Sequence, residues 1–269
     1  MRILDNKASY ELARCSRVFN LHRPKHFPRA IIDATCVDDV VAGVKLAIQQ
    51  NCQVAVRSGG HSIFVWSLQN DSLLVDLGNW KEIVVETGPF IAKVTSSVTK
   101  GRVEQPAQSL WSHVPSWTLP RRRPWGIFAP WWSRLELSKL GWACERVIAV
   151  EVVTAQGELL LCNEKQNEEL CWAARGSGPR TCRSAPPLNT ADSHSFRVFP
   201  AIVTRFHLQL LPYLSAGFLS STYVYPSALY RQAFGWIQSI VPEADEDTEI
   251  VMIAFYLDSE HDICLKLHL

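Results

Sequence analysis

Short apolar runs and one amphipathic stretch alternate in the first third of the chain, and together they predict a β-α-β unit. Ala30 to Ile32 has the apolar character of a buried strand. The apolar residues that follow recur at helical spacing and predict a helix ending near Asn51, namely Val40, Val41, Val44, Ala47 and Ile48. Gln53 to Val56 is a second short apolar run, which predicts the strand that completes the unit.

A capping box is expected at the start of this helix. Thr35 is followed three residues later by Asp38, the spacing at which the two side chains can satisfy free backbone amides reciprocally. Asp38 here takes the place of the more usual Glu or Gln.

Four further strands are predicted between residues 73 and 208. They are Leu73–Leu77, Glu82–Glu86, Arg146–Ala155 and Leu159–Cys162. The last two are separated by a turn containing Gly157, which predicts a hairpin. Asn167 is expected to cap a short helix that ends at Gly176 and carries Trp172 as a core aromatic residue. Together with the β-α-β unit, these segments predict an α+β fold.

A new unit is expected after Pro212. Phe218–Tyr225 alternates as a strand, Ser227–Ile240 has a helical apolar stripe, and Glu249–Tyr256 has the character of another strand. At the other end, Pro24 and Pro28 mark a boundary after a polar segment in which only Tyr10–Arg14 has helical character.

A polar turn containing two glycines follows the strand Gln53–Val56. Adjacent glycines allow the backbone to approach a ligand closely, and successive N–H groups in such a turn can surround an anion such as a phosphate. The first residue of the turn adds positive charge and the fifth adds an imidazole nucleophile. The candidate binding residues are Arg57, Ser58, Gly59, Gly60, His61 and Ser62. The alternative interpretation is a hairpin turn with an exposed histidine, because short motifs often match by chance.

Composition and charge narrow the possible functions. The chain has 269 residues, is 47% hydrophobic and carries a formal net charge of +1, so it lacks the basic character of a nucleic-acid-binding protein. Its eight cysteines include no C-x-x-C pair, which argues against a zinc site. The beginning of the chain has no signal-peptide pattern, and no apolar run is long enough to span a bilayer, so a cytoplasmic protein without a membrane partner is expected.

The turn R-S-G-G-H-S after a V-x-V strand resembles the FAD-attachment segment of the p-cresol methylhydroxylase/vanillyl-alcohol oxidase flavoproteins, and in particular their berberine-bridge-enzyme-like branch. Three further segments resemble that family in the correct order, at residues 141–158, 167–178 and 203–208. The resemblance covers roughly residues 24–213.

This resemblance implies a fold, a cofactor and site residues. The fold would be a PCMH-type FAD-binding domain of two α/β subdomains at residues 24–213. It would follow an N-terminal extension at 1–23 and precede the start of an α+β substrate domain at 214–269. The cofactor would be FAD, attached covalently through His61. Gly141, Val147 and Ile148 would contact the flavin, although plain strand core is an equal alternative for Val147 and Ile148.

The implied function is oxidation of a small-molecule specialised metabolite, with molecular oxygen as the electron acceptor. The alternative is a truncated, non-catalytic pseudoenzyme that binds flavin weakly or not at all. A partner-binding scaffold has no positive support in the sequence. The catalytic base, the substrate and the oligomeric state are not indicated.

Two stretches depart from the family pattern. Residues 95–140 carry five tryptophans where the family has a glycine-rich run. Because the tryptophan codon always contains the start of a glycine codon one base later, translation in a shifted frame is one hypothesis for this stretch. Residues 180–198 are rich in loop-forming residues and are interpreted as a retained intron. Trp66 stands where the family usually has a small residue. Family members are also much longer, so a C-terminally truncated chain with little or no oxidase activity is predicted.

Overall fold

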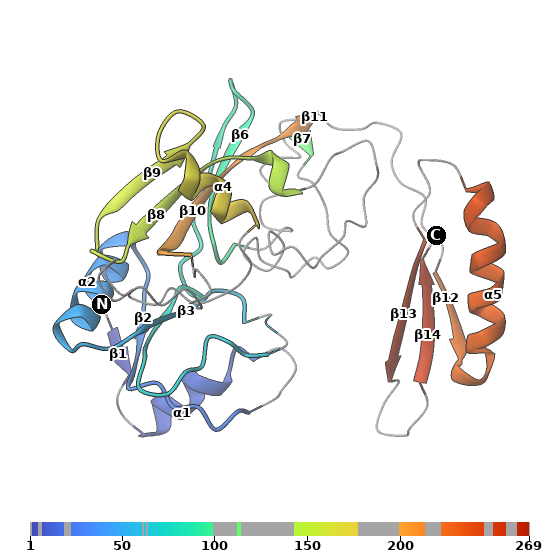
Figure 1. Ribbon diagram of the computed structural model, residues 1–269, viewed down its shortest axis with the longest axis horizontal. Coiled ribbons are helices and arrows are strands. Elements are labelled where there is room, and N and C mark those ends of the chain that lie inside the picture. Colours follow the sequence, from blue (N-terminus) through green and yellow to red (C-terminus); the bar gives the residue numbers. More distant parts are fainter. Residues whose placement is uncertain are drawn as a thin grey trace, which may run out of the picture.

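The computed structural model contains helices and several antiparallel or mixed sheets, which makes it an α+β protein as predicted (Figure 1). The structure describes residues 2–4, 7–18, 23–60, 62, 64–98, 112–113, 143–176, 199–212, 222–244, 250–256 and 263–268.

The first sheet is mostly parallel and has the strand order β1-β2-β4-β3. Its strands are β1 (Arg2–Leu4), β2 (Ala30–Asp33), β3 (Val54–Arg57) and β4 (Leu73–Asp76). Strand β4 lies between β2 and β3 and is parallel to both, whereas β1 is antiparallel to β2. The predicted β-α-β unit is therefore confirmed, with β4 inserted between its two strands.

Helices cover both faces of this sheet. Helix α2 (Val37–Gln49) packs on one face, where its buried Val40, Val44 and Ala47 meet Ile32 and Val75. Helix α1 (Lys7–Cys15) packs on the other face through residues that include Tyr10 and Ala13. Because side chains alternate between the two faces of a strand, neighbouring positions such as Ile31 and Ile32 enter different cores.

The N-terminal segment contributes more structure than the sequence indicated. A single helical turn was expected at Tyr10–Arg14, but α1 has nine residues and β1 adds a strand to the sheet. Pairing of β1 with β2 and packing of α1 against β2 join this segment to the first sheet. The polar composition of residues 1–23 concealed this because only one stripe of α1 is apolar.

The side chain that caps α2 is not the predicted one. Asp39, rather than Asp38, accepts hydrogen bonds from the backbone N–H of Thr35 at 2.9 Å and from its hydroxyl at 3.1 Å. Burial acts to raise the pKa of Asp39, but the hydrogen bonds it accepts outweigh that effect and lower the pKa to about 2. The expected reciprocal box does not form, because the N-cap position is Cys36 rather than Thr35 and the Cys36 side chain makes no capping hydrogen bond.

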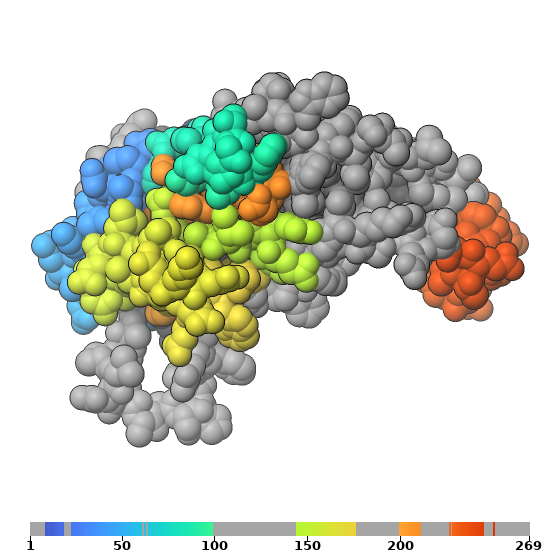
Figure 2. Space-filling model, turned by 90° about the horizontal axis from the view of Figure 1, so that it is seen from above, coloured from blue at the N-terminus to red at the C-terminus, as the bar shows by residue number. Residues whose placement is uncertain are grey.

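The second sheet is antiparallel and has the order β5-β6-β10-β8-β9. Its strands are β5 (Ile83–Glu86), β6 (Ile91–Thr95), β8 (Val147–Thr154), β9 (Leu159–Asn163) and β10 (Ala201–Gln209). The predicted hairpin of β8 and β9 is confirmed, and Gly157 in its turn has φ +81°. Figure 2 shows the segments of this sheet side by side in teal, orange and yellow-green. Strand β6 was not recognised in the sequence.

Helix α4 (Glu168–Gly176) packs against β8 and β9, as the sequence predicted in position and length. The expectation that Trp172 is a core aromatic residue is wrong, since it is 72% exposed. Its neighbour Cys171 is buried in the core instead. A nine-residue helix on a sheet buries only one stripe, and Trp172 lies on the other side.

A third sheet of order β12-β14-β13 lies with helix α5 apart from the first two sheets (Figure 1). Its elements are β12 (Thr222–Pro226), α5 (Tyr230–Ile240), β13 (Val251–Tyr256) and β14 (Ile263–His268). The predicted strand-helix-strand order is confirmed, and β14 was not expected. Short elements complete the structure, namely β7 (Ser112–His113) paired with β11 (Leu211–Pro212), and the 3-10 turns Ala143–Arg146, Ser227–Leu229 and Val241–Glu243.

Several sequence predictions fall outside the described residues. These include the predicted site residues His61 and Gly141, most of the tryptophan-rich stretch and the whole of residues 180–198. The frame-shift and intron hypotheses therefore remain predictions. No helix within the described ranges is both long and apolar enough to cross a bilayer.

Candidate functional site

Three chain segments meet at the carboxyl ends of the parallel strands β3 and β4. Arg57 and Asp76 are partners in the register of the two strands, so the residues that follow leave the same sheet edge. The carbonyl of Arg57 accepts a hydrogen bond of 2.8 Å from the N–H of Leu77. The hydroxyl of Thr95, at the end of β6, donates to the carbonyl of Trp80 at 2.8 Å. Residues 58–60, 77–80 and 95–98 are thereby joined at one edge, where α/β sheets commonly bind ligands.

The glycine turn has the backbone conformation that only glycine adopts easily. Gly60 has φ +70°, and a Cβ at this position would lie 1.8 Å from the carbonyl oxygen of Arg17. Gly60 thus permits a close approach of the segment after α1, and the expected approach of this turn to a ligand stays a prediction. The N–H groups of Gly59 and Gly60 donate no hydrogen bond to any described residue. Within the described part of the chain, these two N–H groups therefore have no acceptor, and an acceptor from a ligand could fill that role.

Replacing Gly60 by alanine is expected to destabilise the protein by about 2 kcal/mol or more, because alanine resists positive φ and the Cβ would displace Arg17. The matched control is Gly235→Ala in the exposed α5, where a Cβ would meet nothing within 4 Å. That change should stabilise by roughly 0.5–1 kcal/mol through helix propensity. Urea unfolding of both variants measures the difference, and equal effects would show that Gly60 is not constrained.

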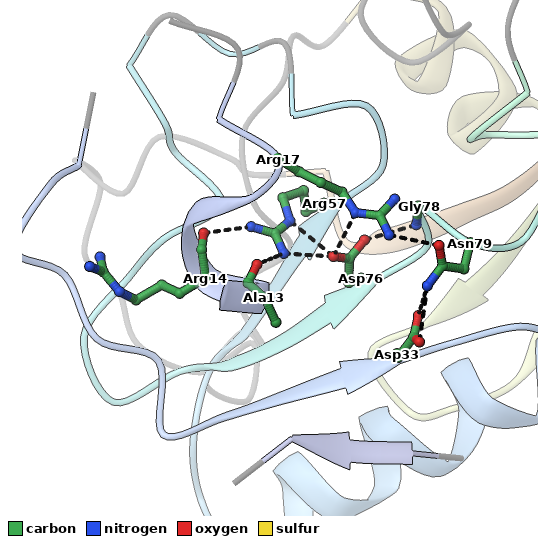
Figure 3. Close-up of polar contacts among 8 residues, drawn as sticks. All are labelled: Ala13, Arg14, Arg17, Asp33, Arg57, Asp76, Gly78 and Asn79. Atoms are coloured by element: carbon green, nitrogen blue, oxygen red, sulfur yellow. Dashed lines mark hydrogen bonds and ion pairs between the residues drawn. The ribbon is translucent and has the colours of Figure 1, made fainter. Parts of the chain in front are cut away.

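The side chain of Arg57, which the sequence predicted to add charge to the turn, is held by other parts of the protein. Its guanidinium is buried, with Nη2 at 2.6 Å from Oδ2 of Asp76 (Figure 3). It also donates to the backbone carbonyls of Ala13 and Arg14 at the end of α1. These contacts use the charge of Arg57 to hold α1 against the strand ends. Arg57 therefore supports the glycine turn structurally, and its predicted part in cofactor binding stays a prediction.

A second arginine lies at this edge and was missed in the sequence. Arg17 donates from Nη2 to Oδ1 of Asn79 at 2.8 Å, and its Nε lies 3.4 Å from Oδ2 of Asp76 (Figure 3). The amide of Asn79 in turn donates to both carboxylate oxygens of Asp33, and the N–H of Gly78 donates to Oδ1 of Asp76. No motif surrounds Arg17 in the sequence, so no local signal indicated this position.

The remaining residues of the predicted turn occupy mixed environments. Ser58 is buried and Ser62 is half-buried, with the hydroxyl of Ser62 accepting from the N–H of Trp66 at 3.4 Å. Trp66 is 36% exposed and stacks on Phe64 with ring centroids 5.1 Å apart. Its ring thus packs on a neighbouring aromatic residue at the surface.

The predicted flavin contacts in β8 belong to the second sheet. Val147 is 2% exposed and lies in the core that this sheet forms with α4. Ile148 is half-buried and points to the opposite face. The structure thus gives the Val147 side chain a core role, one of the alternatives left open by the sequence.

Three neutral donors near this edge are buried without a hydrogen-bond partner among the described residues. They are the hydroxyls of Ser96 and Ser97, just after β6, and the indole N–H of Trp80. Buried polar groups normally have partners, so unpaired ones mark places where a further group can bind. Amide, hydroxyl and indole donors suit the phosphate, ribityl and ring acceptors of FAD, and the donor set of this edge fits that cofactor. Among the described residues, no three His, Cys, Asp or Glu side chains form a cluster that could hold a metal.

Comparison with known proteins agrees with this chemistry. Residues 28–121, which include the glycine turn, match the FAD binding domain family. The chain is 36% identical over 250 residues to FAD-linked oxidoreductase janO of Penicillium janthinellum, covering 93% of this chain and 51% of that protein. It is 32% identical over 270 residues to FAD-linked oxidoreductase nodO of Hypoxylon pulicicidum, covering 96% of this chain and 53% of the relative.

Solved structures share the fold. The 6-hydroxy-D-nicotine oxidase from Arthrobacter nicotinovorans superimposes with a TM-score of 0.76 at 19% identity, over 99% of this chain and 54% of that one. The BBE-like 1 protein of Physcomitrella patens gives a TM-score of 0.69 at 22% identity, with 99% and 54% coverage. The chain spans about half the length of the relatives that it matches. It belongs to the FAD-linked oxidoreductases, and the match to the FAD binding domain family lies at residues 28–121.

Proposed function

We propose that this chain holds FAD at the carboxyl ends of β3 and β4 as part of an oxidoreductase that oxidises a small-molecule specialised metabolite with molecular oxygen. The observation that carries the proposal is the turn at Gly59 and Gly60, whose N–H groups have no acceptor among the described residues and lie within the region matching the FAD binding domain. When bound, FAD supplies the two-electron redox chemistry, and the protein supplies binding, orientation and electrostatics.

The residues at the strand ends have separate proposed roles. Backbone N–H groups of Gly59 and Gly60 bind phosphate, with Ser58 and Ser62 completing the turn, while Arg57 keeps the turn in place. His61 forms the covalent bond to the flavin. Gly141, Val147 and Ile148 contact the cofactor through their backbone, as the family resemblance implies. We also propose the division into residues 1–23, an FAD-binding domain at 24–213 and the start of a substrate domain at 214–269.

Support for the substrate class comes from the relatives. Several are fungal proteins named FAD-linked oxidoreductases, and one from Penicillium decumbens is named a bifunctional decalin synthase. A bacterial relative, 25% identical over 164 residues, is named (R)-6-hydroxynicotine oxidase. Their names favour a small organic substrate over a macromolecule.

The purified chain is expected to carry flavin, because the amides of Gly59 and Gly60 and the buried hydroxyls of Ser96 and Ser97 have no partner among the described residues. The measurement is the visible absorbance spectrum of the protein before and after acid precipitation. A second step reduces the bound flavin with dithionite and admits air, and rapid return of the absorbance supports oxygen as the acceptor. A colourless protein that gains no absorbance when incubated with FAD would contradict the proposal and favour the pseudoenzyme alternative.

A further inference from the structure

Two guanidinium groups share one carboxylate at the ends of β3 and β4 (Figure 3). Oδ2 of Asp76 lies 2.6 Å from Nη2 of Arg57 and 3.4 Å from Nε of Arg17. One negative charge thus faces two positive charges. The side chain of Arg17 is 21% exposed and that of Arg57 only 1%, so the uncompensated charge lies on Arg17. Asp33 is the other acidic residue of this network, and Asn79 stands between it and Arg17.

One donor nitrogen of Arg17 has no acceptor in the described part of the chain. Its Nε and Nη2 are directed at Asp76 and Asn79, whereas Nη1 donates to no described residue. A Cβ built on Gly78 would lie 1.6 Å from this Nη1, so the guanidinium rests directly on the backbone at the end of β4. The backbone carbonyl of Arg17 lies against Gly60, just after the end of β3. Arg17 therefore bridges the two strand ends, and its Nη1 has no acceptor among the residues that the structure describes.

We propose that Arg17 binds the pyrophosphate of FAD, together with the free N–H groups of Gly59 and Gly60. The inference rests on the proposed function, because it assumes that FAD binds at this edge. A guanidinium can donate two parallel hydrogen bonds to the oxygens of a phosphate. These bonds are charge-assisted and therefore stronger than those from neutral amides. The network through Asp76 and Asn79 holds the guanidinium in place before the phosphate arrives, which lowers the entropic cost of binding.

The test compares FAD, which carries the pyrophosphate, with riboflavin, which does not. Titrations by flavin fluorescence are made in the full chain carrying His61→Ala, so that binding stays reversible. Arg17→Gln is expected to weaken FAD binding by about tenfold to a hundredfold and to leave riboflavin binding within about twofold. Arg17→Lys keeps the charge but lacks the planar guanidinium. Its FAD affinity should therefore lie between those of the parent and of Arg17→Gln. Arg231→Gln on the exposed face of α5 makes the same charge change far from the strand ends.

The outcomes separate this inference from the proposed function. Equal weakening of FAD and riboflavin in Arg17→Gln, with a lower melting temperature, would mean that Arg17 only anchors the N-terminal segment. Unchanged FAD affinity in Arg17→Gln would also overturn the inference while leaving FAD binding intact. If the His61→Ala chain bound neither ligand, the proposed function itself would fail. Should Arg17→Gln not fold, the FAD-to-riboflavin ratio of Arg17→Lys decides the question.

Discussion

Replacing Arg57 by methionine is expected to lower the free energy of unfolding by about 3–5 kcal/mol. The change removes the 2.6 Å partner of the buried Asp76 and the donor to the carbonyls of Ala13 and Arg14. Breaking one side of a buried ion pair typically costs about 3–5 kcal/mol, while whole domains are stable by only about 5–15 kcal/mol. Circular dichroism during urea unfolding measures the loss. The control is Arg231→Met, which removes an exposed arginine from α5 and should be nearly neutral.

A double variant tests whether the unpaired carboxylate of Asp76 causes this loss of stability. Combining Arg57→Met with Asp76→Leu removes both buried charges, and it should recover part of the lost stability because no charge is left unpaired. Recovery will be incomplete, since Asp76 also accepts the N–H of Gly78 and contacts Arg17. If Arg57→Met alone were as stable as the parent, its guanidinium would not be the structural link described above. FAD titration of the same variant would then test whether the Arg57 side chain contacts a phosphate instead.

His61→Ala is expected to abolish covalent flavin attachment completely. Attachment needs a nucleophilic side chain at the cofactor, and the imidazole of His61 is the one that the turn supplies. No cysteine lies between Cys52 and Cys144 that would serve as a second anchor. The readout is flavin fluorescence of the denatured protein band after electrophoresis in the presence of detergent.

Ser62→Ala is the matched control for this experiment, because it changes the neighbouring residue of the same turn and keeps the imidazole. It should retain the fluorescent band. Fluorescence that persists in the denatured His61→Ala protein would refute the assignment. Loss of fluorescence in both variants would instead point to a folding defect of the turn, which a melting curve of each variant detects.

Much of the local structure could be predicted from the sequence. The unit of β2, α2 and β3, the hairpin of β8 and β9, and helix α4 all follow from hydrophobic periodicity and turn residues. These signals are local, since period and turn chemistry act within a few residues. Strand β6 escaped detection because Lys93 interrupts its short apolar pattern. The cap of α2 was placed one residue early because the same composition allows either Asp38 or Asp39 to reach back.

The sequence by itself determined the α+β class, the glycine turn and, through four ordered motifs, the likeness to FAD-linked oxidoreductases. Only the tertiary structure decided what the charged residues around that turn do. The partners of Arg57 lie 19 and 44 residues away, and Arg17 reaches Asn79 across 62 residues. The local sequence around an arginine beside a glycine turn does not show whether its side chain faces a phosphate or a carboxylate. Burial beside Asp76 gives Arg57 a structural role, whereas Arg17, which no motif marked, keeps a donor nitrogen without an acceptor among the described residues at the strand ends.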